Sequence, residues 1–324
     1  MPRLALMGAF GVITCLAASP ALAQQVFESV GSRALGMGGA FVAVADDGTA
    51  AFWNPAGMAL SPRGNLTVEW TRFQTGNQDQ PPAPGPTTRT ASFATFGSSN
   101  FSLSYASLQG TDLVTTPVGT MAELLKTTQY GATVLQAVAP GVILGSTLKL
   151  VRGFAASEAA VGTTGSNALS QVSSLQGQTV TRFDFDVGLL VDMKQIRLGL
   201  AVKNLEEPSF PEPGGTPFTL HRQVRAGLAV LPTSGMTLAL DLDLEAIDLR
   251  GGLRRMIAFG GEDRLGSRFA LRGGLRWSVT GDRQLVGSAG LSVALRPGAW
   301  IDGHYTQGGL DGDRGFGIAF RVGS

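Results

Sequence analysis

Apolar residues recur at every second position along most of this chain, and this period restricts the possible folds more than any other feature. In TRFDFDVGLLVDMK (residues 181–194), one face would carry Phe183, Phe185, Val187, Leu189 and Val191. The opposite face would carry Arg182, Asp184, Asp186 and Gly188. A period of two places alternate side chains on opposite faces of a β-strand, whereas an amphipathic helix repeats every 3.6 residues. The chain is therefore predicted to be all-β.

Roughly fourteen segments of this kind can be found, each about as long as the ten residues that a tilted strand needs to cross a bilayer. They begin near positions 64, 88, 100, 128, 141, 180, 195, 221, 235, 254, 267, 284, 298 and 313. A soluble β-sandwich has the same period and would turn its charged face to water. The strands alone therefore leave that alternative open.

The connections between the segments favour a membrane barrel. The odd-numbered connections are 74–87, 109–127, 155–178, 205–220, 246–252, 280–283 and 308–312. The even-numbered ones are 97–100, 140–141, the segment near Lys194, 232–235, 263–267 and 296–298. The odd ones are mostly long and the even ones short, as in outer-membrane barrels with long outer loops and tight periplasmic turns. We predict a transmembrane antiparallel β-barrel of about fourteen strands whose charged face lines the lumen.

The first residues have the layout of a cleaved secretory signal. Arg3 is followed by an apolar run from Leu4 to Ala18 and then by Ala21-Leu22-Ala23, so cleavage is expected before Gln24. The predicted organisation is a signal peptide at 1–23, a plug at 24–62 and the barrel at 63–324. Together, the signal and the barrel predict the bacterial outer membrane as the location and its lipid as a neighbour.

Composition excludes several functions. Cys15 is the only cysteine and falls in the signal, so the mature chain has no disulfide, thiolate metal site or cysteine nucleophile. Lipid attachment at Cys15 is the alternative, which its polar neighbour Thr14 disfavours. Without Arg3, 24 basic residues face 24 acidic ones, and a nucleic-acid partner would need a basic face.

Residues 45–60 read ADDGTAAFWNPAGMAL and precede the first strand. This region has too much glycine and alanine for a strand. Residues 47–52 could form a short helix capped by Asp46 or Asp47, and Asn54-Pro55 would end it. In an exported barrel, a mostly apolar segment finds shelter from water and lipid only in the lumen, so we expect a plug, or hatch.

Two interpretations of the polar residues in this segment stay open. In the first, Asp46, Asp47, Asn54 and Pro55 anchor the plug, because charge-assisted hydrogen bonds hold best away from water. The expected luminal partners are Arg225, Arg268, Arg272 and Arg276. In the second, the carboxylates only cap a helical turn.

The stretch GSRALGMGGAFVAVADDGTAAFWNPAGMAL (31–60) resembles the N-terminal plug of FadL/TodX-type barrels, in which a Gly-rich stretch precedes Ala-Asp-Asp and Asn-Pro-Ala. The same opening occurs in PorV/PorQ-like barrels of secretion systems. Later stretches such as HRQVRAGLAVLP (221–232) and FALRGGLRW (269–277) are similar to this second group. Both resemblances imply fourteen strands and a plugged lumen.

The sequence gives only weak signals for an enzymatic function. Gly36-Met37-Gly38-Gly39 lacks a third glycine at the right offset, a preceding strand and the following Lys-Ser of a phosphate loop. His304 with one of many serines is a poor signal for a lipase. Asp184 with Asp186, or Asp241 with Asp243, is better explained as luminal ion pairing than as glycosidase acids. We predict no catalytic residue, cofactor or metal.

Two functions remain. The FadL resemblance implies a transporter for hydrophobic small molecules of the fatty-acid or hydrocarbon class, with Phe41, Phe52, Trp53 and Met58 as the lining of its route. The PorV resemblance implies instead a partner of secretion-system or cargo proteins. The outer connections are mostly Ser, Thr, Gly, Gln and Pro, which counts against tight capture of a hydrophobic solute.

Overall fold

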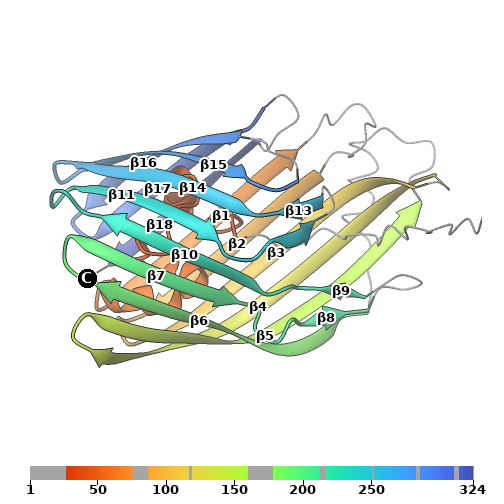
Figure 1. The fold of residues 1–324 in the computed structure, drawn as a ribbon, viewed down its shortest axis with the longest axis horizontal. Helices are drawn as coiled ribbons and strands as arrows, with labels where there is room; N and C mark the ends of the chain where they lie inside the picture. The colour runs from red at the N-terminus through yellow and green to blue at the C-terminus, as the bar shows by residue number, and fades with distance from the viewer. Residues whose placement is uncertain are drawn as a thin grey trace, which may run out of the picture.

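The computed structural model describes residues 27–75, 87–116, 119–159, 178–211, 217–249, 252–281, 285–309 and 314–323. Within these ranges, fourteen antiparallel strands form one closed barrel (Figure 1). They are β1 (Asn65–Thr75), β2 (Thr87–Gly97), β3 (Phe101–Thr116), β4 (Gly119–Ala139), β5 (Val142–Ala159), β6 (Val180–Asp192), β7 (Ile196–Lys203), β10 (Gln223–Val230), β11 (Met236–Asp243), β14 (Met256–Leu265), β15 (Phe269–Ser278), β16 (Leu285–Arg296), β17 (Ala299–Gln307) and β18 (Arg314–Gly323). Each pairs with its neighbour in this order, and β18 pairs with β1 to close the sheet. The predicted signal peptide, residues 1–23, lies outside the described residues.

The predicted strand number is confirmed, and most strands begin within a few residues of the expected positions. One prediction is wrong: residues 109–127 are mostly strand rather than loop, because β3 and β4 pair from Phe101↔Val134 to Thr116↔Gly119. Thr, Val and Leu dominate this stretch, and such residues favour strands. Mutual pairing satisfies the backbone hydrogen bonds of the extension.

The two ends of the barrel differ as expected. Tight turns join the strands at one end, on the left of Figure 1, for example at 140–141 and 266–268. At the other end, two connections contain hairpins that the sequence had suggested were loop. These are β8 (Ser209–Phe210) with β9 (Phe218–Thr219), and β12 (Ile247–Leu249) with β13 (Gly252–Arg254).

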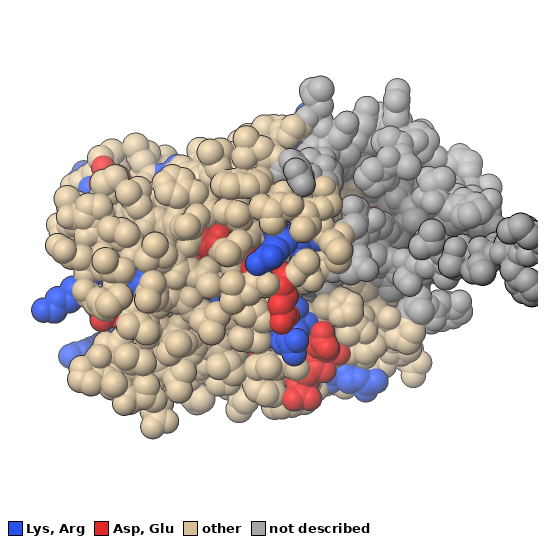
Figure 2. Space-filling model, in the orientation of Figure 1, with Lys and Arg blue, Asp and Glu red and all other residues tan. Residues whose placement is uncertain are grey.

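The outer face of the barrel is apolar and the inner face is polar. Phe183 is 54% exposed while Asp184 beside it is fully buried, and Leu240 is 44% exposed against 2% for Asp241. Charged side chains gather mostly near the ends of the strands and leave a largely uncharged band between them (Figure 2). A soluble sandwich would bury the apolar face, so the structure has the pattern of a membrane-spanning barrel. Among the described helices, none is long and apolar enough to cross a bilayer.

Residues 27–61, here called the luminal segment, lie inside the barrel (Figure 1). The segment contains α1 (Ser32–Gly36), α2 (Ala50–Trp53) and a 3₁₀ helix, η1 (Pro55–Leu60). From residue 27 to residue 58, every residue except Asp46 is buried. Helix α1 contacts β15 to β18, and η1 contacts β4 to β6, so the segment reaches opposite walls.

The predicted helix at residues 47–52 begins later than expected. Asp47 does not cap α2. Its Oδ1 instead accepts from the backbone and hydroxyl of Thr49, at 2.9 and 2.5 Å, which forms a turn before the helix. Asn54 ends α2 in an extended conformation, as expected for a residue before proline. Its side chain then accepts from Ala56 N and so caps η1.

Candidate functional site at the luminal segment

The backbone of the luminal segment lies against glycines of the barrel wall. A Cβ at Gly274 would lie 2.2 Å from the carbonyl carbon of Met37, and one at Gly260 would lie 2.1 Å from its oxygen. Similar close approaches of the segment occur at Gly145, Gly188 and Gly199. These positions are inward-facing and spread around the barrel. Glycine is required there because any side chain would occupy the space that the segment fills.

Arg33, in α1, joins two parts of the segment to the wall. Its guanidinium donates to Asp46, to Asp47 Oδ2 at 3.1 Å, and to both oxygens of Glu262 in β14 at 2.7 and 2.9 Å. The Arg33 side chain is only 3% exposed. Burial alone would lower the pKa of Arg33, but the Asp46, Glu262 and Asp47 carboxylates raise that pKa well above its usual value. Bidentate pairing of this kind is strong and directional.

The network continues around the wall toward the tight-turn end. Arg272 Nε donates to Glu262 at 2.5 Å, and its Nη2 donates to Ser292 at 2.5 Å. Arg321 bridges Asp302 and Asp47, with 3.4 Å between its Nη1 and Asp47 Oδ2. Although burial raises the pKa of Asp47, the charges of Arg321 and Arg33 outweigh it and lower that pKa. Four strands and the segment thus share one set of buried ion pairs.

A second cluster surrounds Glu28, at the other end of the segment. Its carboxylate pairs with Arg225 Nη2 at 2.6 Å and with Arg254 Nη2 at 2.7 Å. Arg225 also pairs with Asp243 at 2.6 Å. Burial opposes ionisation of Glu28, but Arg225, Arg254 and Arg276 hold its pKa well below its usual range. Glu28 therefore remains charged in the lumen.

Two wall carboxylates bind the backbone of the segment instead of its side chains. Glu69 accepts from the N–H groups of Gly31 and Ser32, and Asp241 accepts from those of Phe41 and Val42 at 2.8 and 2.9 Å. Sequence reasoning missed both roles, because it looked for acids in the plug and arginines in the wall. The sequence alternation indicated that Asp241 faces inward. It did not indicate that Asp241 would bind the backbone N–H groups of Phe41 and Val42.

The four residues expected to line a route belong to one buried hydrophobic cluster. Trp53 has Phe27, Phe41 and Phe52 within 5.6, 5.9 and 6.5 Å between ring centroids. Phe41, Phe52, Trp53 and Met58 are at most 5% exposed. Wall residue Lys203 places its Nζ 3.0 Å from the centroid of Phe52. None of the four lines the two luminal cavities described below, so here they form the core of the segment.

The expected anchors meet other partners than predicted. Asp46 and Asp47 pair with Arg33 of the same segment, and also with Arg197 and Arg321 of the wall. Arg225 and Arg272 do lie in the lumen, but they pair with Glu28 and Glu262. Arg276 is also buried there, and its charge helps to lower the pKa of Glu28.

The prediction that Arg268 lies in the lumen is wrong. Arg268 is exposed in the turn before β15, which begins at Phe269. The inward–outward alternation of β15 would place Arg268 on the inner face, but β15 begins one residue after it.

Asn54 and Pro55 lie against β5 and β6. Asn54 Nδ2 donates to the carbonyls of Val42 and Leu189 at 2.8 and 3.1 Å. Pro55 and Ala56 approach Gly145 and Gly188. Asn54 therefore joins two parts of the segment to the wall through its amide, without any charge.

We expect Asn54→Asp to lower the midpoint of thermal unfolding more than Asn54→Ala. The alanine removes the amide donor that binds the carbonyls of Val42 and Leu189, and a buried carbonyl left unsatisfied costs about 1–3 kcal/mol. The aspartate adds a carboxylate oxygen facing those same carbonyls. Differential scanning calorimetry of the purified barrel measures the midpoint. Asn100→Asp, in an exposed turn, is the matched control; equal midpoints for Asn54→Asp and Asn54→Ala would contradict the expectation.

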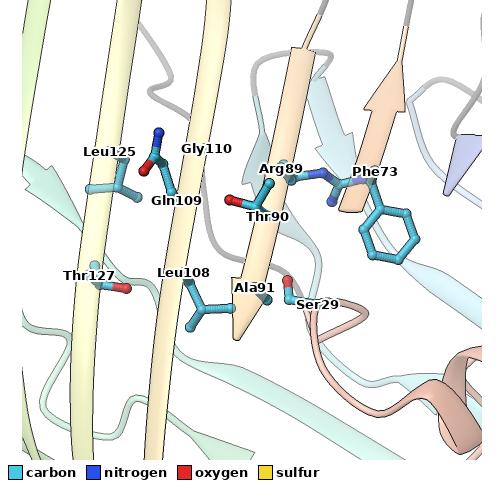
Figure 3. Close-up of a pocket in the computed structure, with 10 residues that line it drawn as sticks. All are labelled: Ser29, Phe73, Arg89, Thr90, Ala91, Leu108, Gln109, Gly110, Leu125 and Thr127. Atoms are coloured by element: carbon cyan, nitrogen blue, oxygen red, sulfur yellow. The ribbon is translucent and has the colours of Figure 1, made fainter. Parts of the chain in front are cut away.

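Two cavities lie on either side of the segment. A polar vestibule of about 400 Å³ opens at the tight-turn end, between Arg33, Asp46 and Asp47 of the segment and Arg264, Arg321 and Pro62 near the strand ends. A cavity of about 30 Å³ lies nearer the outer end, between Ser29 and side chains of β1 to β4 such as Phe73, Leu108 and Leu125 (Figure 3). A cavity that holds benzene has roughly 150 Å³, so this space is too small for a hydrocarbon.

The described residues hold no group of three or more His, Cys, Asp or Glu side chains arranged for a metal ion. The acidic residues of the lumen are occupied mainly by arginines, lysines and backbone N–H groups. These contacts hold the luminal segment in place.

Comparisons with known proteins identify the fold. A family model described as "F plasmid transfer operon, TraF, protein" matches residues 89–243, less than half of the chain. No protein of curated function matches the sequence. Solved structures match nearly throughout: a CymD monoaromatic hydrocarbon channel has a TM-score of 0.66 at 13% identity, covering 91% of this chain and 98% of that one.

Two further solved structures are similar to the same extent. The toluene transporter TbuX of Ralstonia pickettii has a TM-score of 0.61 at 14% identity, covering 91% of this chain and 98% of that one. A FadL homologue of Pseudomonas aeruginosa has a TM-score of 0.59 at 14% identity, with 91% and 97% covered. The chain thus has the FadL/TodX-type barrel fold. The PorV/PorQ resemblance stays a prediction.

Proposed function

We propose that this protein is a bacterial outer-membrane channel for hydrophobic small molecules, with its own luminal segment as the plug. The observation that carries the proposal is a FadL-type barrel whose lumen is filled by residues 27–61, held by buried ion pairs. Two of the solved structures named above are a monoaromatic hydrocarbon channel and a toluene transporter. Hydrocarbon or fatty-acid solutes are the class proposed here.

In this arrangement the channel is closed. The vestibule at the tight-turn end stops at Arg33, Asp46 and Asp47, and the small cavity near Ser29 is below the size of a hydrocarbon. We therefore infer that a solute crosses after part of the segment moves. The ion pairs suit such a plug because they hold one position strongly and are lost together when the segment shifts.

Uptake measurements test the proposal. Bacteria that lack their own hydrocarbon channels should take up radiolabelled toluene or a long-chain fatty acid faster when they carry this barrel than when they carry the empty vector. A hydrophilic sugar of similar size should show no such gain. Equal uptake of every hydrophobic solute with and without the barrel would reject transport of this class.

The second candidate is a partner protein in a secretion or envelope-assembly system. Two observations favour it: the matching family model is named for a protein of a plasmid transfer operon, and the outer connections are largely polar. In this role the outer end of the barrel would hold another polypeptide, and the plug would stay in place.

Native mass spectrometry of the barrel, gently extracted from its own membrane, separates the two candidates. A bound hydrocarbon or lipid of reproducible mass supports the channel. A stoichiometric protein partner without such an adduct supports the assembly role and rejects the channel.

A further inference from the structure

One outer connection reaches directly into the lumen. Between the end of β11 at Asp243 and the start of β14 at Met256 lies hairpin β12–β13, whose last residue is Arg254. Arg254 Nη2 donates to Glu28 Oε2 at 2.7 Å. The Arg254 side chain is 17% exposed and that of Glu28 is 2% exposed. A residue at the outer rim thus binds a carboxylate buried inside the barrel.

The base of the hairpin belongs to the same set of hydrogen bonds. Asp243 accepts from Met256 N at 2.8 Å, from Arg255 Nε through its carbonyl at 2.8 Å, and from Arg225 Nε at 2.6 Å. Arg225 also binds Glu28, at 2.6 Å. The hairpin, the wall and the luminal segment are therefore joined by consecutive charged contacts.

The hairpin also has a contact that involves no charge. Gly281, after β15, has a φ of +64°, and a Cβ there would lie 2.3 Å from the carbonyl oxygen of Leu253. Hairpin residue Leu253 rests on this glycine. Any side chain at Gly281 would push the hairpin away from its position and would also strain the backbone.

We propose that hairpin β12–β13 is a latch on the plug. Its contact with Gly281 and the Arg254–Glu28 pair together hold residues 27–31 in the lumen from the outer side. Lifting the hairpin at the cell surface, by a solute or by a partner chain, would release the N-terminal end of the segment. The latch rests on the proposed function, since it supplies the route by which an event outside the barrel reaches the plug.

Hydrogen exchange measured by mass spectrometry on the full barrel in lipid nanodiscs tests the latch without any solute. We expect Arg254→Gln to speed exchange of residues 27–31 by roughly tenfold or more, as for loss of a charge-assisted hydrogen bond. Arg222→Gln is the matched control, because Arg222 is an exposed arginine of the same rim whose pair with Glu245 spans 3.4 Å.

A second variant moves the hairpin without touching a charge. Gly281→Ala should speed exchange of residues 27–31 in the same way, while Gly266→Ala should not. Gly266 has a similar φ of +65°, lies in a tight turn at the opposite end, and has no atom within 4 Å of a Cβ placed there. Heat-dependent migration on gels confirms that each variant has formed its barrel.

The outcomes are distinct. Wild-type exchange in both Arg254→Gln and Gly281→Ala overturns the latch. Faster exchange in Arg254→Gln alone overturns it too, because the pair is then a local contact that the hairpin does not control. Since no solute is present, a positive exchange result combined with failed uptake would reject the transport proposal and leave the latch standing.

Discussion

Replacing Arg33 by Met is expected to open the channel while leaving the barrel folded. The methionine keeps the apolar stem, but Asp46, Asp47 and Glu262 lose the guanidinium that binds all three. Removing one partner of a buried ion pair costs about 3–5 kcal/mol. If that energy holds the segment in place, the population with the segment displaced rises by about 10²- to 4 × 10³-fold.

Single-channel recording in planar bilayers measures this change. Wild-type barrels should stay closed for most of the recording, and Arg33→Met barrels should conduct for a large share of it. Arg264→Met is the control, because Arg264 approaches the same Glu262 at 3.8 Å from a position that is 51% exposed. A pair this long whose arginine is half exposed to solvent contributes little. Closed Arg33→Met barrels would show that the charge network does not hold the plug.

Gly274→Val is expected to displace the segment by volume instead of charge. A Cβ at Gly274 would lie 2.2 Å from Met37 C and 2.3 Å from Gly38 N, and both are backbone atoms that cannot rotate away. The strand itself accepts valine readily, since β-branched residues favour strands. The barrel should therefore form, with residues 33–40 expelled from their place along β14 and β15.

Cleavage by an added protease at Arg33 detects the displaced segment. Arg33 is buried in the wild type, so only variants with a displaced segment should be cut there. Gly273→Val is a close control: it is the neighbouring residue, it faces outward, and its nearest atom, Ser288 O, is 4.0 Å from a Cβ. Equal resistance of the Gly274→Val and Gly273→Val barrels would mean that the contact with Met37 is not needed for seating.

Much of the barrel was predictable from the sequence, because strand parity is a local property. Alternation at Phe183 and Asp184, or Leu240 and Asp241, placed each residue on its face before any pairing was known. Tight turns such as 140–141 and 296–298 were likewise visible as Pro-Gly signals. Local signals failed where strands extend by pairing, as between β3 and β4, since that extension depends on the neighbouring strand.

For the candidate site, too, some features were predictable from the sequence and others were not. The sequence alone determined that a Gly- and Ala-rich segment precedes a barrel with a charged inner face, and Asn54-Pro55 marked the end of a helix. Only the tertiary structure decided which charges meet. Arg33 pairs with Glu262, and Glu28 with Arg254, although more than two hundred positions separate each pair. Such contacts depend on the closure of the barrel and on the height of each strand in it, and no local pattern of residues encodes either quantity.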